Sequence, residues 1–451
     1  MMKYTEFKER VMAAAASRGL TEYELYAEEK ENISAETLNH EISAFSSGNV
    51  TGACFRCVSQ GKLGYASTEL YTLSEAERVV EAAMENAACL ETEGEALIHG
   101  PGDTYTKVEA GTVTEPTASQ LTGLAMKIEE AAYAADLKVA DGSQSGAVFY
   151  RNQIYLSNSR GLDLTHENAY TMAYCSPIAK EGEEMFSGFY SVGGDFAGLD
   201  PQAIAQKGVE DAVSQIGARI LPTGTYDVMF SNHMTAALLR VYANIFSAEA
   251  AQKGMSPLAG KEGEPVAAPC VTLTDDPFCG DSLVRVPFDG EGVATSRRDV
   301  VKEGRLVTLL YNLAAAHRAG VASTGNGVKA GYAAPVSIQP HNFYLQKGGG
   351  GTTEEMYEKL GDGVYITELN GMHAGANPVT GDFSLASAGF LIEKGKKTGP
   401  VKDFTVSGNF YQLLQDISLV GDDWELRPPM RGGSCFGGPS FIVRGMSIGG
   451  K

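Results

Sequence analysis

Basic residues are scarce in this sequence. Its 451 residues include 36 Lys and Arg against 56 Asp and Glu, which gives a formal net charge of −20. A surface so acidic repels phosphate groups, so direct nucleic-acid binding through a basic face is disfavoured. Tryptophan is present once, whereas glycine is abundant at 53 residues. Abundant glycine favours tight turns and β-structure over a helical bundle.

Cysteine and long apolar runs are also in short supply. The seven cysteines are scattered along the chain, and such an odd, sparse set is typical of reduced thiols in a cytosolic protein. No apolar run approaches the roughly 18 residues that a membrane helix needs. Charged side chains interrupt the first residues of the chain, which argues against a signal peptide. We therefore expect a cytoplasmic protein without a membrane partner.

The hydrophobic pattern predicts an α+β fold. Hydrophobic residues make up 43% of the chain, which is enough for a sizeable core. In the N-terminal part, helical spacing over 2–18 and 74–91 flanks short strands over 22–29, 49–59 and 62–67. This pattern predicts an N-terminal α/β part with antiparallel strands flanked by helices.

A similar order of helix, strands and helix recurs after a stretch at 94–116 that is rich in glycine and poor in large apolar residues. Helices are predicted over 117–136 and 201–218, with antiparallel strands between 138 and 193. The length of the chain favours two or three domains. The predicted domains are 1–94, 95–222 and 223–451.

The C-terminal part has a different pattern. One helix is predicted over 232–251, and short β runs bounded by glycine follow it. We expect a mostly antiparallel β domain, closed or sandwich-like. One stripe of the helix is apolar and suits a core, whereas the opposite face, with Arg240, Tyr242 and Asn244, is polar enough to line a groove.

Histidine is too sparse for a helical zinc motif. No two of the seven histidines are closer than 24 residues in sequence, so no helix offers the two imidazoles that HExxH-type sites require. The single CxxC motif, Cys54–Cys57, lies in a predicted strand, where residues three apart face opposite sides. The residues alone therefore assign no metal ligand and no catalytic residue to this chain.

Two features keep open the hypothesis that the protein is a self-sufficient hydrolase. The acidic pairs Asp275-Asp276 and Asp289-Gly-Glu291 could bind a divalent cation or perform acid–base chemistry, although such pairs more often cap turns. Cys435 lies in a Gly-Ser-Cys-Phe segment similar to the nucleophile segment of cysteine proteases, but no histidine follows it in the sequence.

The sequence resembles the TldD/PmbA family over nearly its whole length, and the motifs that carry the resemblance keep the order and spacing of the family. They are Arg56…Gly61…Gly64-Tyr-Ala-Ser-Thr68, Pro287–Val293, Arg297-Arg298-Asp299, Glu303-Gly304, Ser323–Asn326, Asn377–Ser384, Ala388–Glu393, Gly408-Asn409 and Met446–Gly450.

This resemblance implies an N-terminal α/β part, a C-terminal mostly antiparallel β part and a link to proteolysis. TldD-type members of the family carry the zinc-protease motif HExxxH and pair with a PmbA-type (TldE) partner. The pair is associated with peptide processing, including microcin maturation and antitoxin degradation. Family members are often labelled as candidate modulators of DNA gyrase.

The sequence departs from the TldD type where the zinc site would be. By offset, Arg240 and Ile245 stand at the histidine positions and Val241 at the glutamate position. None of these side chains can bind zinc or activate water. Cys435 lies in the region of a TldD-type cysteine ligand, but at a different spacing from the C-terminal segment. The chain therefore resembles the PmbA (TldE) type, a partner without its own metal site.

The leading hypothesis is a non-catalytic subunit of a cytosolic TldD-type zinc metalloprotease that acts on flexible peptides. No cofactor is expected in this chain, and zinc is expected on the TldD-like partner. Self-association is left open. The alternatives are a self-sufficient peptidase, built on the carboxylates or on Cys435, and a regulator that binds DNA gyrase.

Candidate peptide contacts lie on the polar face of the 232–251 helix and in two loops. Short polar side chains and exposed glycine backbone can hydrogen-bond an extended peptide, although the same residue types are also good turn formers. The candidates are Arg240, Tyr242, Asn244, Ser323, Thr324, Asn326, Asn377, Thr380, Asp382 and Ser384.

Overall fold

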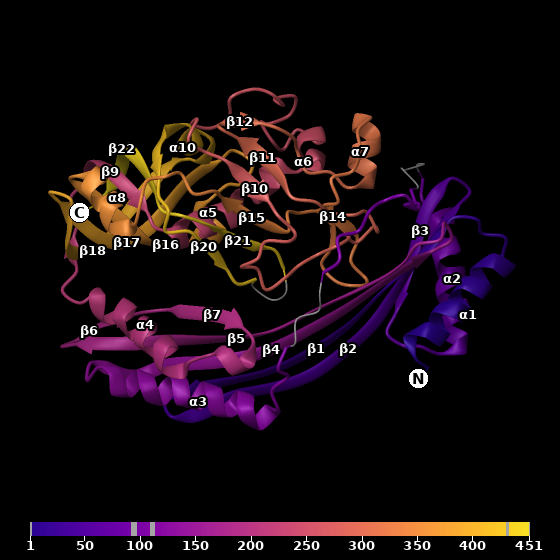
Figure 1. Ribbon diagram of the computed structural model, residues 1–451, viewed down its shortest axis with the longest axis horizontal. Coiled ribbons are helices and arrows are strands. Elements are labelled where there is room, and N and C mark those ends of the chain that lie inside the picture. The colour runs from indigo at the N-terminus through magenta and orange to yellow at the C-terminus, as the bar shows by residue number, and fades with distance from the viewer. Residues whose placement is uncertain (1, 92–96, 109–112, 430–432, 451) are drawn as a thin grey trace.

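A long curved sheet and a β-rich C-terminal half are the two main parts of the protein. The computed structural model describes residues 2–91, 97–108, 113–429 and 433–450. In Figure 1 the sheet lies beneath the C-terminal half, which rests on the inner side of its curve. This arrangement of helices with mainly antiparallel sheets confirms the predicted α+β fold.

The curved sheet is built jointly by the first two predicted domains. Its strand order is β3-β2-β1-β4-β5-β6, with β7 paired to β5, and every pairing is antiparallel. β1 pairs with β4 from Glu24 to Leu38, so the two units share one sheet. The strands are β1 (Tyr23–Leu38), β2 (Glu41–Ser59), β3 (Lys62–Thr68), β4 (Val139–Asn158), β5 (Asp163–Glu181), β6 (Glu184–Ser187) and β7 (Tyr190–Gly194).

The three-domain division stays a prediction. Its first boundary, at residues 94–95, and part of the predicted linker lie outside the described residues.

Two helix pairs cover the outer face of the curved sheet. Leu25 and Ala27 of β1 are buried under the first pair and Ala35 under the second, because alternate residues of a strand face the same side. The ends of all four helices lie within about one turn of the predicted ends, which confirms these helices. They are α1 (Tyr4–Ser17) with α2 (Leu73–Ala88), and α3 (Ala118–Ala135) with α4 (Pro201–Ser214).

Local details of the N-terminal part differ from the sequence pattern. The N-cap of α2 is Thr72, whose hydroxyl accepts a hydrogen bond from the backbone N–H of Glu75, so the helix begins just before the predicted residue 74. β1 and β2 have 16 and 19 residues and are much longer than predicted. β2 extends through a serine- and glycine-rich stretch of low β propensity because this stretch pairs with β1.

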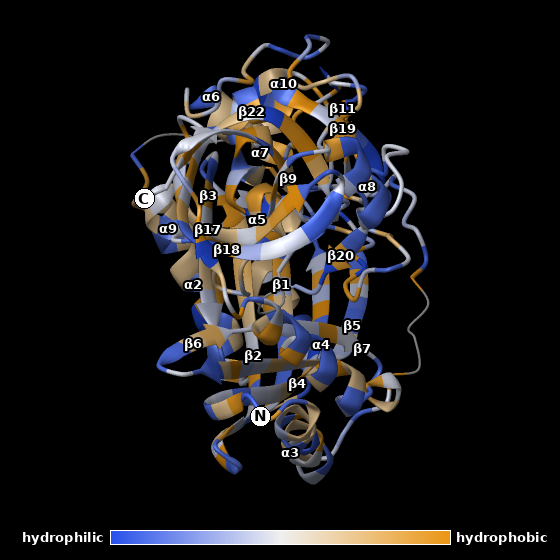
Figure 2. Cartoon of the chain, turned by 90° about the vertical axis from the view of Figure 1, so that its left-hand side faces the viewer, coloured by the Kyte–Doolittle hydropathy of each residue, from blue (hydrophilic) through white to orange (hydrophobic). Residues whose placement is uncertain are grey.

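The C-terminal half contains a closed barrel. β18 pairs with both β17 and β22, which closes the ring β22-β9-β16-β17-β18. Of these ring pairings, only that of β9 with β16 is parallel. Figure 2 shows strongly hydrophobic colour in β9 and neighbouring strands. The barrel strands and those that extend the sheet are β8 (Arg219–Ile220), β9 (Gly224–Phe230), β16 (Gly363–Asn370), β17 (Asp382–Glu393), β18 (Lys396–Asn409), β19 (Ile417–Val420) and β22 (Phe441–Gly449).

A second, six-stranded sheet lies beside the barrel in the order β12-β11-β10-β15-β21-β20. Helix α5 (Asn232–Tyr242) contributes Leu238, Leu239 and Tyr242 to the large core shared by both sheets. The sheet consists of β10 (Leu273–Asp275), β11 (Arg298–Lys302), β12 (Arg305–Leu306), β15 (Asn342–Leu345), β20 (Glu425–Arg427) and β21 (Cys435–Gly438). The remaining elements are α7 (Leu313–Ala319), β13 (Gly327–Lys329), β14 (Val336–Ile338), α8 (Thr353–Leu360), α9 (Met372–Gly375) and α10 (Phe410–Asp416).

The predicted single helix over 232–251 is wrong. The chain forms α5, a 3₁₀ turn over Ala243–Phe246 and a separate short helix α6 (Ala248–Gln252). Ser247 interrupts the helix because it has an extended backbone and its hydroxyl caps α6 by accepting the backbone N–H of Ala250. Periodicity alone did not reveal this break, since alanines continue the helical pattern across it.

Gly64 of β3 tests how closely α2 packs on the sheet. A Cβ atom at this position would lie 2.0 Å from the backbone oxygen of Ala83 in α2, so the helix would have to move. We expect Gly64→Ala to lower the free energy of unfolding by about 1–3 kcal/mol in urea titrations.

A glycine with open space around it, in a helix, provides the control. Gly123 of α3 has open space where an added Cβ atom would lie, so Gly123→Ala should instead stabilise by about 0.5–1 kcal/mol. Equal effects of the two substitutions would contradict the close α2 packing.

Candidate functional site

A groove follows one side of α5 and α6 and has a volume of about 420 Å³. Arg240 and Asn244 line it on the helical side, and Gln339, Pro340 and Ser434 line the opposite side. Asn244 is exposed and Arg240 is half-buried. The break in the predicted helix shapes this wall, because the 3₁₀ turn carries Asn244 outward before α6 begins.

Arg240 brings a positive charge to this groove. Its guanidinium carbon lies 5.7 Å from the centre of the Phe436 ring, a cation–π distance. Burial, reinforced by the charge of Arg427, lowers the pKa of Arg240. Guanidinium and amide side chains donate hydrogen bonds to carbonyl and carboxylate oxygens, the acceptors that a peptide offers.

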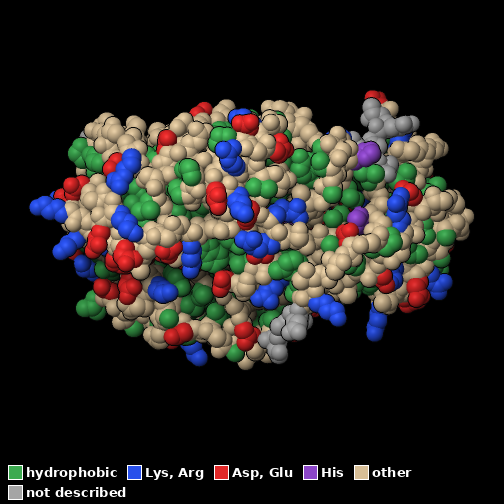
Figure 3. Space-filling model, turned by 45° about the horizontal axis from the view of Figure 1, so that its top comes forward, with side chains coloured by type: hydrophobic (Ala, Val, Ile, Leu, Met, Phe, Trp, Pro, Cys, Tyr) green, Lys and Arg blue, Asp and Glu red, His purple; other side chains and the backbone are tan. Residues whose placement is uncertain are grey.

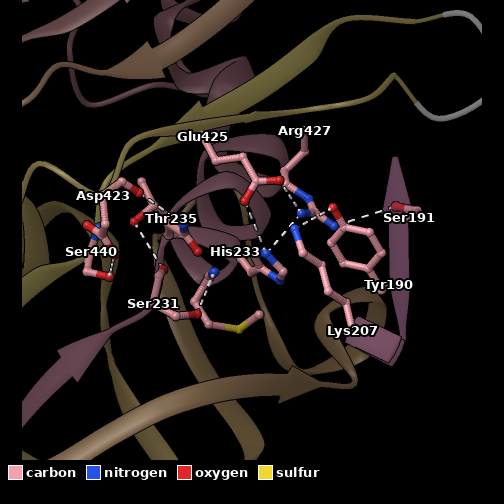
Figure 4. Close-up of polar contacts among 12 residues, drawn as sticks. Tyr190, Ser191, Lys207, Ser231, His233, Thr235, Asp423, Glu425, Arg427 and Ser440 are labelled. Carbon is pink, nitrogen blue, oxygen red and sulfur yellow. Dashed lines mark hydrogen bonds and ion pairs between the residues drawn. The ribbon is translucent and has the colours of Figure 1, made fainter. Parts of the chain in front are cut away.

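A polar cluster lies at the start of α5 (Figure 4). The Nη1 atom of Arg427 donates to Nε2 of His233 at 2.9 Å and to Oε1 of Glu425 at 2.7 Å. Burial by itself would raise the pKa of Glu425, but the contacts with His233 and Arg427 outweigh it and lower this pKa to about 2. Sequence reasoning missed this cluster, since His233 and Arg427 are 194 residues apart.

A second groove, of about 460 Å³, runs between α4 and the barrel and is lined by His233. Asp211, Glu368 and Lys207 add charges of both signs to its lining. Burial raises the pKa of Asp211, and the charge of Glu368 adds to this effect. The two grooves flank α5, so one helix positions side chains in both.

A smaller cavity of about 270 Å³ lies between the curved sheet and the C-terminal half. Glu28, Lys30 and His166 line it from the sheet, and Lys329 lines it from the opposite side. Burial lowers the pKa of His166 and of Lys329, which favours their neutral forms. Charged side chains share the lining with apolar ones such as Ile154 and Phe288, and the cavity depends on the two halves being held together.

The structure brings together only two of the predicted peptide contacts. Arg240 and Asn244 line the same groove, but Tyr242 between them does not. The Tyr242 side chain is fully buried and its ring stacks on Phe410 at 4.2 Å. The expectation that Tyr242 faces a groove is therefore wrong, because its large ring fills the core.

The predicted loop contacts at 323–326 are mostly internal. Thr324 and Asn326 are buried. The Thr324 hydroxyl accepts the backbone N–H of Tyr311, and the Asn326 amide donates to Asp275. Ser323 is half-buried and donates to the backbone oxygen of Tyr311. These residues hold the loop together, so the turn-forming interpretation describes Thr324 and Asn326 better than direct peptide contact.

The predicted contacts at 377–384 form an exposed turn of their own. The side-chain oxygen of Asn377 accepts the backbone N–H groups of Val379 and Thr380. Asp382 accepts a hydrogen bond from Asn409, and Ser384 pairs with Ser407. None of these four predicted residues belongs to the lining of the α5–α6 groove. Their role in peptide contact stays a prediction.

The carboxyl groups of the acidic pairs accept hydrogen bonds from within the protein. Asp275 accepts the backbone N–H of His341 as well as the Asn326 amide. Asp289 accepts the backbone N–H groups of Glu291, Val293 and Gly327. Burial, together with the neighbouring charge of Glu291, raises the pKa of Asp289 to about 8. These carboxyl groups organise loops and offer little to a metal or substrate.

Metal-ligating side chains do not gather in the described part of the chain, where no group of three or more His, Cys, Asp and Glu residues could hold an ion. At the positions expected for a zinc motif, Arg240 is half-buried and Ile245 is buried in the core. The residues present therefore do not fit a zinc ion.

Known proteins show where this fold belongs. The sequence matches all three domains of the PmbA/TldA metallopeptidases: domain 1 over 23–87, the central domain over 111–216 and the C-terminal domain over 223–450. The chain belongs to the PmbA/TldD family.

Relatives in this family come from bacteria and archaea. Metalloprotease PmbA of Escherichia coli O157:H7 is 28% identical over 323 residues, which cover 69% of this chain and 67% of that protein. A TldD homologue of Haemophilus influenzae is 28% identical over 253 residues, or 56% of this chain and 51% of that protein.

Two solved structures share the fold. A Thermotoga maritima protein named as a candidate modulator of a DNA gyrase has a TM-score of 0.90 and 30% identity, covering 99% of this chain and 100% of that one. TldE from Thermococcus kodakarensis has a TM-score of 0.89 at 23% identity, covering 98% and 99%, and supports the fold alone.

Charges of both signs are spread over the visible surface. Figure 3 shows acidic and basic side chains interspersed on one face, without a continuous basic patch. None of the helices in the described ranges has both the length and the apolar character that crossing a membrane requires.

The reactivity of the Cys435 thiol tests the alternative that the protein is a cysteine peptidase. Its thiol is buried, and burial raises its pKa to about 11, so little nucleophilic thiolate is present at neutral pH. We expect iodoacetamide to label exposed Cys89 in the folded protein while Cys435 stays unmodified, as peptide mapping by mass spectrometry would show. Rapid labelling of Cys435 in the folded protein would contradict this result.

Glu425 gives the polar cluster a pH dependence. Because its pKa is lowered from the ordinary value of 4.5 to about 2, its charge stabilises the folded state above pH 4.5. This contribution disappears as the pH falls towards 2. We expect Glu425→Gln to reduce the free energy of unfolding at pH 7 by at most about 1 kcal/mol, since Glu425 is partly solvent-exposed.

Urea unfolding at several pH values measures this effect. The difference between wild type and Glu425→Gln should shrink below pH 4.5. Glu183 is exposed in the turn between β5 and β6, and Glu183→Gln provides the control. A Glu425→Gln effect that is equal at every pH would contradict the role of the charge.

Proposed function

We propose that this protein is a non-catalytic, PmbA/TldE-like subunit that assembles with a TldD-type zinc metalloprotease and helps to bind flexible peptides. The single observation that carries the proposal is the α5–α6 groove. Arg240 and Asn244 line it, at positions where the family resemblance leads us to expect a zinc motif. Their side chains can donate hydrogen bonds to a peptide but are not zinc ligands.

The groove suits an extended peptide chain. Arg240 and Asn244 donate hydrogen bonds from one wall, while Ser337, Gln339 and Ser434 add short polar groups on the other. Such a lining recognises backbone carbonyl groups more than particular side chains. Broad recognition of this kind fits unfolded or flexible substrates.

Activity of the chain alone is disfavoured by its buried carboxyl and thiol groups. Asp275 and Asp289 are satisfied by internal hydrogen bonds, and the raised pKa of Cys435 keeps its thiol protonated. Peptide-bond hydrolysis would then depend on the metal of the partner. The proposal places the complex in the cytoplasm.

Reconstitution tests the proposed assembly. The purified chain is mixed with a TldD-type protein that carries HExxxH, and cleavage of an unfolded peptide is followed by mass spectrometry. We expect cleavage by the mixture but not by this chain alone, and a chelator should abolish it. Chelator-sensitive cleavage by this chain alone would overturn the proposal.

A groove variant separates peptide binding from assembly. Asn244→Trp fills the exposed side of the groove and should lower kcat/KM of the mixture about tenfold or more, because a misplaced peptide loses orientation at the reacting centre. Co-elution of the two subunits should be unchanged. Thr398→Trp, at an exposed position of β18 outside the groove, is the control and should leave cleavage unaffected.

A further inference from the structure

Two buried polar atoms lie unpaired in the wall of the cavity between the curved sheet and the C-terminal half. They are Nε2 of His166 and Oδ1 of Asn152, and neither has a hydrogen-bond partner among the residues that the structure describes. Both residues line the cavity, and His166 is only 9% exposed. A buried polar atom without a partner costs stability unless water or a ligand satisfies it. These two atoms therefore indicate a binding site.

The curved sheet places the two side chains next to each other. In the antiparallel pair of β4 and β5, Ile154 lies opposite His166 and Asn152 lies opposite Asn168. Asn152 and His166 are thus diagonal neighbours on one face of the sheet, with Cα atoms about 7–8 Å apart. Asn168, in contrast, is fully engaged, because its side chain bonds to both the backbone N–H and the backbone oxygen of Arg285. One small group between Asn152 and His166 can reach both unpaired atoms.

The charged groups of the cavity wall are already compensated. Glu28 forms an ion pair with Lys30 at 2.7 Å, and its other carboxylate oxygen accepts the hydroxyl of Tyr26. The Nζ atom of Lys329 donates to the backbone oxygen of Ala334 at 2.8 Å. A charged ligand would lose its hydration here without gaining a free counter-charge from these groups. The ligand that fits the cavity is therefore uncharged.

The rest of the lining favours an aromatic group with a hydroxyl. Ile154, Phe288 and Tyr150 give the walls apolar and aromatic surface. The volume of about 270 Å³ is just below the roughly 300–1,000 Å³ of sites for drug-sized ligands, so it suits one large side chain. A phenol packs its ring against such walls. Its hydroxyl can donate to Oδ1 of Asn152 while its oxygen accepts the N–H of neutral His166, in the tautomer protonated at Nε2.

The cavity shares a wall with the α5–α6 groove. Gln339, Pro340, Gly433 and Ser434 line both the groove and the cavity. A peptide that lies along the groove can therefore send a side chain past these residues into the cavity.

We infer that this cavity binds the side chain of a tyrosine residue in a peptide that lies in the α5–α6 groove. The inference rests on the proposed binding of flexible peptides and adds a preference to it. The groove recognises the peptide backbone, whereas the cavity recognises one side chain through its ring and its hydroxyl. Peptides that carry tyrosine should therefore bind more tightly than other peptides of the same length.

Calorimetric titration of the purified full chain with short peptides tests this preference. The peptides differ only at the central position, which is tyrosine, phenylalanine, alanine, arginine or glutamate. We expect the tyrosine peptide to bind at least about tenfold more tightly than the phenylalanine peptide, because a ring without a hydroxyl leaves the two polar atoms unpaired. The arginine and glutamate peptides should bind no more tightly than the alanine peptide, since their charges find no free partner in the cavity.

Asn152→Leu separates peptide preference from fold stability. It replaces an unpartnered carbonyl oxygen by an apolar group, so the melting temperature should stay the same or rise, while the preference for tyrosine over phenylalanine should disappear. Ala330→Trp, at an exposed position of the lining, narrows the cavity and should also abolish the preference. Asn86→Leu makes the matched change at an exposed position of α2 outside the lining and should leave the preference intact.

The outcomes distinguish this inference from the proposed function. Equal binding of the tyrosine, phenylalanine and alanine peptides would overturn the inference and leave peptide binding by the groove in place. Binding of N-acetyltyrosinamide as tight as that of the tyrosine peptide would show that the cavity takes a free small molecule, which would overturn the link to the groove. Binding of none of the peptides would overturn both the inference and the peptide-binding part of the proposed function.

Discussion

The buried guanidinium of Arg56 is the interaction on which the rest of the structure depends. It reaches from β2 to Glu24 of β1 at 2.7 Å and to Glu291 of the C-terminal half at 3.6 Å. Burial would lower the pKa of Arg56, but the two carboxylates raise it and keep the group charged. Removing the guanidinium would leave two buried carboxylates without their shared cation, which costs several kcal/mol.

This ion pair contributes to the contact between the two halves, and the cavities between them depend on that contact. The other oxygen of the Glu291 carboxylate accepts the backbone N–H of Leu313, so both carboxylate oxygens are engaged. The cavity between the curved sheet and the C-terminal half and the groove between α4 and the barrel both have walls from each half. Neither would exist if the C-terminal half moved away from the sheet.

Helix α5 carries polar side chains to two grooves. His233 at its start is engaged by Arg427, and Arg240 near its end lies over Phe436. Guanidinium groups are permanently charged hydrogen-bond donors and do not bind metal ions. The helix therefore presents side chains that can donate hydrogen bonds to grooves on two sides.

The sequence by itself determined the elements whose signals are local, such as the four N-terminal helices, and it showed the absence of paired histidines. It also carried the family resemblance, because the motifs keep their order along the chain. Tertiary structure decided which polar residues are accessible. Tyr242 and Asn326 are polar residues like Asn244, so residue type alone predicts that all three are accessible. Tyr242 and Asn326 are nevertheless buried, because they pack against or bond to partners such as Phe410 and Asp275. Contacts between distant segments, such as the pairing of β1 with β4 and of β18 with β22, were likewise invisible, because a strand pattern gives the side-chain period but not the neighbouring strand. The sequence alone thus determined the local elements and the wide spacing of the histidines, whereas only the packed structure decided which grooves those elements enclose.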